Sequence, residues 1–112
     1  MLPQAYRLRL EKDIKTLFAR GKSVFGSLVG MKFRANALPV SRFAIVAGVK
    51  VSKKAVVRNR LKRQVRAIIH ELLPKIAPGH DVLLYLKPQA VDKSSEELKK
   101  EVFAGFKKAK LL

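Results

Sequence analysis

The 112-residue sequence contains no cysteine and only eight acidic residues, and both shortages exclude classes of function. Without cysteine, the chain has no disulfide framework, no thiolate zinc site and no cysteine nucleophile. The scattered carboxylates do not form the cluster that a metal-dependent nuclease needs to hold Mg²⁺. The sequence also lacks an apolar run near the ~20 residues of a membrane span, and it shows no secretory leader pattern. We therefore expect a cytoplasmic protein that does not contact a membrane.

Basic residues dominate what is present, since 25 Lys and Arg give a formal net charge of +17. Hydrophobic residues make up 48% of the chain, which is enough for a folded core and too much for a disordered basic tail. The length predicts a single domain, residues 1–112. The charge is densest in segment 51–75 and nearly balanced after it. Such a charge is typical of a protein whose partner is a nucleic acid.

Hydrophobic periodicity predicts three helices and a small sheet. Helices are expected over about 10–20, over 53–73, and after Ser94, which forms a capping box with Glu97 and precedes an apolar stripe. Strands are expected over about 29–34, where Val29, Met31 and Phe33 alternate with Lys32 and Arg34, and over 43–49. Val24 and Phe25 are expected to start the same extended stretch as the first of these. A third apolar run, 82–86, is expected in the centre of the sheet. The order α-β-β-α-β-α predicts an α+β fold with helices packed over a sheet of about four strands.

The expected helix over 53–73 is strongly polarised. Val57, Leu61 and Val65 begin an apolar stripe, and the remaining surface is almost wholly cationic. Lys53 and Lys54 lie near the positive end of the helix dipole, where anions are favoured, so the arrangement favours bound phosphate groups. The alternative is a solvated basic face whose long side chains cover the core.

One stretch of this helix carries a family resemblance. Segment 51–54 (VSKK), segment 55–63 (AVVRNRLKR) and Arg66 together resemble the signature of the protein subunit of bacterial ribonuclease P. Phe18 with the following Gly-Lys-Ser, and segment 81–88, are similar to other parts of that family, so the resemblance covers nearly the whole chain.

The resemblance implies a fold and a function. It implies an α+β sandwich with a left-handed βαβ crossover, although most such crossovers are right-handed. It implies an RNA-binding subunit of an endoribonuclease that removes the 5′ leader of precursor tRNA. The ribonuclease P RNA would contain the active site and hold the Mg²⁺ ions, so no catalytic or metal-binding side chain is expected here. The protein would be a monomer in a 1:1 ribonucleoprotein.

The resemblance also assigns residues. Phe18 would line a cleft for the single-stranded leader, with Lys32 and Arg34 as phosphate contacts; the alternative for Phe18 is packing in the core beside Leu17. The positions that match the signature are the expected contacts to the ribonuclease P RNA: Lys53, Lys54, Arg58, Asn59, Arg60, Lys62, Arg63 and Arg66.

The sequence departs from the family pattern in a few places. About three residues that often separate Lys54 from Ala55 in the family are missing, which implies a tighter entry into the helix. Ile14 and Lys32 stand where aromatic residues are common. Two other functions stay open from the residues alone, namely a basic structural protein of the ribosome and an autonomous nuclease. For the nuclease, the best candidate base is at His80-Asp81, which is more simply a polar strand start.

Overall fold

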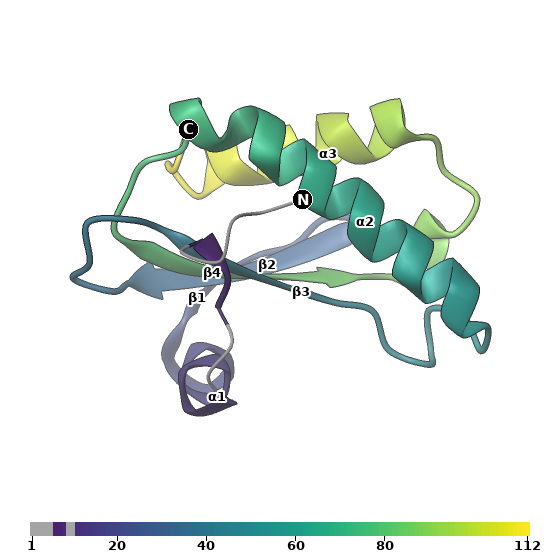
Figure 1. The fold of residues 1–112 in the computed structure, drawn as a ribbon, viewed down its shortest axis with the longest axis horizontal. Helices are drawn as coiled ribbons and strands as arrows, with labels where there is room; N and C mark the ends of the chain where they lie inside the picture. Colours follow the sequence, from purple (N-terminus) through teal and green to yellow (C-terminus); the bar gives the residue numbers. More distant parts are fainter. Residues whose placement is uncertain (1–5, 9–10) are drawn as a thin grey trace.

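The computed structural model describes residues 6–8 and 11–112, which form one mixed sheet with helices on both sides (Figure 1). The predicted helix start at Leu10 lies outside the described residues. Short 3-10 turns follow α2 at Leu73–Lys75 and β4 at Pro88–Ala90. The main elements in chain order are α1 (Glu11–Arg20), β1 (Lys22–Val24), β2 (Val29–Ala35), β3 (Arg42–Val46), α2 (Ala55–Leu72), β4 (His80–Leu86) and α3 (Ser95–Lys108).

Strand β4 lies inside the sheet, whose strand order is β1-β2-β4-β3. Its residues Val82–Leu84 are fully buried, which confirms the central position predicted from the apolar run. β4 pairs antiparallel with β2 and parallel with β3. Because parallel neighbours need a crossover connection, α2 links β3 to β4 across one face of the sheet. The βαβ unit is therefore present, and the left-handed sense of its crossover stays a prediction.

The two faces of the sheet are covered unequally. Helices α2 and α3 lie together over one face, whereas α1 lies over the other (Figure 1). A small second core beneath α1 joins Leu17 to Leu83 of β4. Since successive strand residues point to opposite faces, Leu84 belongs instead to the larger core. That larger core contains the expected stripes of both covering helices: Leu61, Val65, Ile68, Leu72, Leu98, Val102 and Phe106.

The segment before β2 differs from the prediction. Val24 does not begin the β2 strand; it belongs to β1, which folds back on β2 as an antiparallel hairpin. The carboxylate of Glu101 on α3 accepts hydrogen bonds from the backbone N–H groups of 27–29 and from the Ser27 hydroxyl. These contacts hold the chain reversal in place. The α+β class and the four strands are as predicted, and the order becomes α-β-β-β-α-β-α.

The connection into α2 is longer than predicted. β3 ends at Val46 rather than Val49, and α2 begins at Ala55 rather than Lys53. A turn closes between the Val51 N–H and the Gly48 carbonyl at 3.0 Å. The Ser52 hydroxyl then accepts from the Lys54 N–H at 3.2 Å, which is a turn contact that competes with helix. At its other end α2 stops at Leu72, one residue before the predicted end, and Pro74 lies in the 3-10 turn.

Candidate RNA interface

The outer side of α2 brings the predicted cations together. Its one acid, Glu71, does not neutralise them, because it pairs with Lys99 of α3 at 2.5 Å. Within residues 6–8 and 11–112, no carboxylate forms an ion pair with any of these cations. The surface therefore keeps its positive charge available for a polyanion. We call this set the basic ridge: Arg58, Asn59, Arg60, Lys62, Arg63 and Arg66.

Two guanidinium groups of the basic ridge also bind the protein's own backbone. Arg58 is half-buried and donates from Nη1 to the carbonyl oxygen of Ser52 at 2.8 Å. Arg60 donates from Nη2 to the carbonyl oxygen of Val91 at 3.3 Å. Because a guanidinium has five N–H donors, each group keeps donors for a phosphate while one of them fixes its orientation. The fully outward positions, Asn59 and Arg63, make no such contact among the described residues.

Lys53 and Lys54 lie at the start of α2, in the connection rather than in the helix. Both side chains are exposed. Lys54 is the N-cap residue, no side chain caps the first turn, and that turn contains no acid. The free N–H groups and the dipole make this end of α2 positive, so two added lysines favour an anion there. Lys53 and Lys54 therefore precede the helix instead of forming its first turn, as was predicted, and they lie next to the start of the basic ridge.

On the opposite face, Phe18 and Lys32 meet. Phe18 near the end of α1 is 50% exposed, so the alternative that places it in the core is wrong. The Lys32 ammonium donates to the Phe18 carbonyl oxygen at 3.2 Å and lies 5.5 Å from the centre of its ring. An exposed ring beside an ammonium group can stack on a base while the cation contacts a phosphate.

Arg34 lies further along β2, beside a polar hollow next to α1. It is exposed and lines this hollow of about 220 Å³, which also contains Asp13 and Arg42. The structure brings Lys32 to Phe18 and places Arg34 two residues further along the same strand, so the groove that Lys32 and Arg34 were expected to share stays a prediction. Since Lys32 and Arg34 point to the same face of the sheet, both remain on the α1 side of the molecule.

A network of charges at this hollow fixes α1 to the sheet. Arg42 donates from Nε and Nη2 to the two carboxylate oxygens of the buried Asp81, at 2.9 and 2.7 Å. Nη2 also contacts Asp13 of α1 at 3.3 Å, and the Asn36 amide donates to Asp81 at 2.9 Å. Hydrogen bonding to Asp81 raises the pKa of Arg42 above its ordinary value. Asp81 is thus a structural acceptor here, which argues against its use as a general base.

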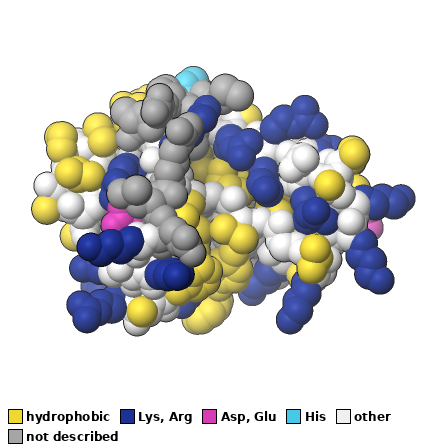
Figure 2. Space-filling model, turned by 60° about the horizontal axis from the view of Figure 1, so that its bottom comes forward, with side chains coloured by type: hydrophobic (Ala, Val, Ile, Leu, Met, Phe, Trp, Pro, Cys, Tyr) yellow, Lys and Arg dark blue, Asp and Glu magenta, His cyan; other side chains and the backbone are white. Residues whose placement is uncertain are grey.

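Sequence patterns did not indicate the residues that lie between these contacts. The strand register places Gly30 opposite Tyr85, and Tyr85 opposite Val46, on the face that α1 covers. The Tyr85 ring lies so close over Gly30 that a Cβ there would be 2.1 Å from its Cζ. Figure 2 shows hydrophobic side chains gathered in the middle of this face, with Lys and Arg on either side. The one signal in the sequence was an aromatic residue inside an otherwise aliphatic strand.

Comparisons with known proteins show what this chain is similar to. The sequence profile of the family Ribonuclease P matches residues 2–110. The "Ribonuclease P protein component" of Microcystis aeruginosa is 40% identical, over 99% of this chain and 96% of that protein. That of a Synechocystis species is 38% identical, over 99% and 90%.

Solved structures give the same result for the fold. The ribonuclease P protein of Thermotoga maritima superposes with a TM-score of 0.84 at 29% identity, over 91% of this chain and 96% of that one. The ribonuclease P protein of Staphylococcus aureus gives 0.86 at 22% identity, over 96% and 98%, which supports the fold alone. Among the described residues, no helix is both long and apolar enough to cross a membrane.

Proposed function

Because the chain belongs to the ribonuclease P protein family, we propose that its two faces bind two different RNAs during tRNA maturation. The protein component associates with the ribonuclease P RNA and is part of the endoribonuclease that processes tRNA 5′ leaders. In this proposal the basic ridge, with Lys53 and Lys54, binds the ribonuclease P RNA. The face under α1 binds the single-stranded leader of precursor tRNA.

The observation that carries the first half is the unneutralised charge of the basic ridge. Its cations have no carboxylate partner among the described residues, and α2 presents them along its exposed side. Contacts of this kind bind phosphates whatever the base sequence, and each releases counterions. The protein would reduce the repulsion between the two RNAs and thereby lower the Mg²⁺ concentration that the RNA needs.

The α1 face would bind the leader mainly by stacking on aromatic rings, with positive charge beside them. Phe18 presents an exposed ring with the Lys32 ammonium beside it, and the Gly30–Tyr85 pair adds an aromatic surface in the next row of the sheet. Unpaired bases stack on such rings, and this stacking tolerates many sequences. Arg34 extends the positive charge along the same face. The α1 side therefore suits a single strand better than a duplex.

We assign cleavage and the Mg²⁺ ions to the RNA partner. The carboxylates of Asp13 and Asp81 both contact the Arg42 guanidinium, so they do not fit a Mg²⁺ site. In the described part of the chain, no three His, Asp or Glu side chains are grouped to hold a metal ion. The protein would act as a monomer in a 1:1 complex in the cytoplasm, positioning RNA without forming bonds to the reacting phosphate.

Reconstitution tests this function directly. A bacterial ribonuclease P RNA is mixed with precursor tRNA at low Mg²⁺, with and without the protein, and removal of the 5′ leader is measured. We expect cleavage only when both the RNA and the protein are present. Cleavage by protein freed of RNA would instead support an autonomous nuclease, and unchanged cleavage on adding protein would contradict the proposed role.

A further inference from the structure

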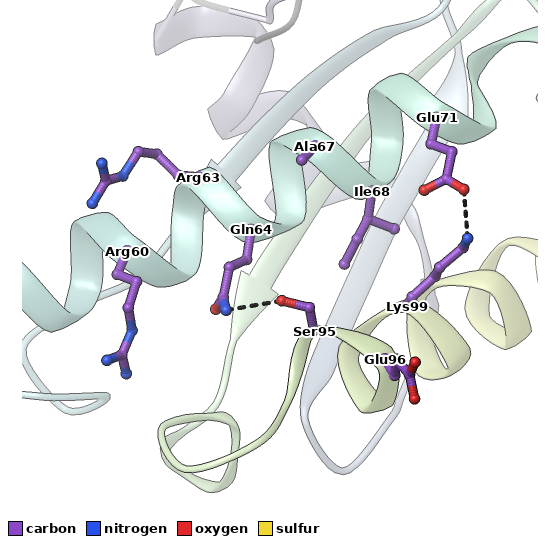
Figure 3. Close-up of a pocket in the computed structure, with 9 residues that line it drawn as sticks. All are labelled: Arg60, Arg63, Gln64, Ala67, Ile68, Glu71, Ser95, Glu96 and Lys99. Atoms are coloured by element: carbon purple, nitrogen blue, oxygen red, sulfur yellow. Dashed lines mark hydrogen bonds and ion pairs between the residues drawn. The ribbon is translucent and has the colours of Figure 1, made fainter.

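A shallow, open hollow of about 500 Å³ lies between helices α2 and α3 (Figure 3). Its volume is within the range of sites that bind small organic groups. Figure 3 shows Arg60 and Arg63 at one end and the Glu71–Lys99 pair at the other. Between them the hollow is lined by Ala67 and by Ile68, and most of its surface is apolar.

The two ends of the hollow differ in charge. Arg60 and Arg63 belong to the basic ridge, and neither forms an ion pair among the described residues. At the other end, Glu71 and Lys99 form an ion pair and Glu96 adds a further carboxylate, so this end is the more negative one. A ligand that fits would therefore carry negative charge beside the arginines and a flat, weakly polar group between the helices.

Gln64, which also lines the hollow, has an unmet hydrogen-bonding requirement. Its amide nitrogen donates to the Ser95 hydroxyl at 3.0 Å. Its amide oxygen is buried and accepts no hydrogen bond within the described chain. A buried acceptor without a donor is unfavourable, because it has lost its hydrogen bonds to water. To bring this oxygen into the hollow, the Gln64 side chain would have to turn and give up its bond to Ser95, after which an N–H group of a ligand could donate to it.

We propose that the hollow accepts the base of one unstacked nucleotide of the ribonuclease P RNA. Its phosphates contact Arg60 and Arg63, its ring lies against Ala67 and Ile68, and its N–H groups reach Gln64. A nucleotide is the occupant because it joins an anion, a flat ring and N–H donors, and because proteins commonly recognise RNA through unstacked bases. The inference rests on the proposed function of the basic ridge and deepens it, because α3 becomes a second wall of that interface.

Filling the hollow without changing any charge tests this inference. Ala67 is exposed on α2, so Ala67→Leu adds volume in the hollow without disturbing the core. Ala104→Leu makes the same change on α3 at an exposed position outside the hollow and serves as the matched control. Binding of fluorescent ribonuclease P RNA is measured for both variants over a series of salt concentrations, and thermal unfolding shows that each is folded.

We expect Ala67→Leu to weaken RNA binding roughly tenfold, as loss of one base contact does, without changing the salt dependence. Ala104→Leu should bind like the parent protein. Ala67→Gln is a second, polar filling variant with the same expected loss, in case the leucine destabilises α2. If filled variants bind as the parent does, or if Ala104→Leu weakens binding equally, the inference is wrong. Arg63→Ala separates the two proposals, because normal binding by that variant would contradict the basic ridge itself.

Discussion

The basic ridge and the α1 face both carry positive charge, but they use it differently. On the ridge, no described carboxylate pairs with a cation. On the α1 face, Arg42 binds two carboxylates, and Lys32 contacts the carbonyl and the ring of Phe18. The basic ridge suits the phosphates of an RNA of any sequence. On the α1 face, the charged groups instead fix the positions of α1 and of the Phe18 ring. We therefore expect variants of the ridge to change salt dependence, and variants of the α1 face to change stability or leader discrimination.

The largest expected effect is the loss of stability in Arg42→Ala. This change leaves Asp81, which is only 6% exposed, without the cation that neutralises it. Removing one partner of such a pair costs about 3–5 kcal/mol of unfolding free energy, and because solvent reaches the rim of the hollow we expect a loss of about 3 kcal/mol. Urea unfolding measures it. Arg34→Ala, an exposed arginine of the same hollow, is the control and should shift stability by less than about 0.5 kcal/mol. Similar losses in both variants would show that Arg42 does not hold α1 in place.

Phe18→Ala tests the leader side of the comparison. Loss of one stacked base costs about 1–3 kcal/mol, so the assembled enzyme should bind leader-bearing precursor roughly tenfold more weakly, with mature tRNA unaffected. Phe25→Ala removes an aromatic ring of greater exposure, 71%, from the β1–β2 loop and should change neither affinity. Equal weakening for precursor and mature tRNA would mean that Phe18 does not contact the leader.

Arg63→Ala tests the ridge side. Losing one phosphate contact should weaken binding of ribonuclease P RNA by about 1 kcal/mol at moderate salt. It should also reduce the slope of log K against log salt by roughly one. Lys108→Ala removes an exposed cation from the end of α3 and is the charge-matched control. A slope that falls equally in both variants would mean that net charge matters and position does not.

Local patterns predicted much of the fold because they depend on neighbouring residues. The Ser94 hydroxyl accepts from the Glu97 N–H at 3.2 Å, as the capping signal indicates. The apolar stripe of α3 and the buried run of β4 also followed from periodicity alone. Strand β1 was not predicted, because nothing in the sequence around Val24 and Phe25 indicates that the chain reverses there. That reversal depends on Glu101, more than 70 residues away along the chain.

The candidate site divides in the same way. The basic ridge was predictable because helical spacing alone places its residues side by side. The contents of the α1 face depend on the pairing of β2, β4 and β3, which joins Gly30, Tyr85 and Val46 from distant segments. Spacing within one strand cannot show which residues become neighbours across the sheet. Lys32 and Arg34 were correctly placed on one face of the sheet, and the groove they were expected to share stays a prediction.

The smallest expected effect concerns Tyr85 and sharpens the chemistry of the α1 face. If the leader stacks against the aromatic surface, the ring matters and the hydroxyl does not, so Tyr85→Phe should change precursor affinity by less than about twofold. Tyr85→Leu keeps an apolar side chain over Gly30 but removes the π face, and it should weaken precursor binding several-fold. Affinity measurements on the assembled enzyme, with mature tRNA as reference, compare the two. If Tyr85→Phe weakened precursor binding as much as Tyr85→Leu does, the leader would be held through a hydrogen bond to the Tyr85 hydroxyl. The α1 face would then share the polar recognition that we assign to the hollow at Gln64.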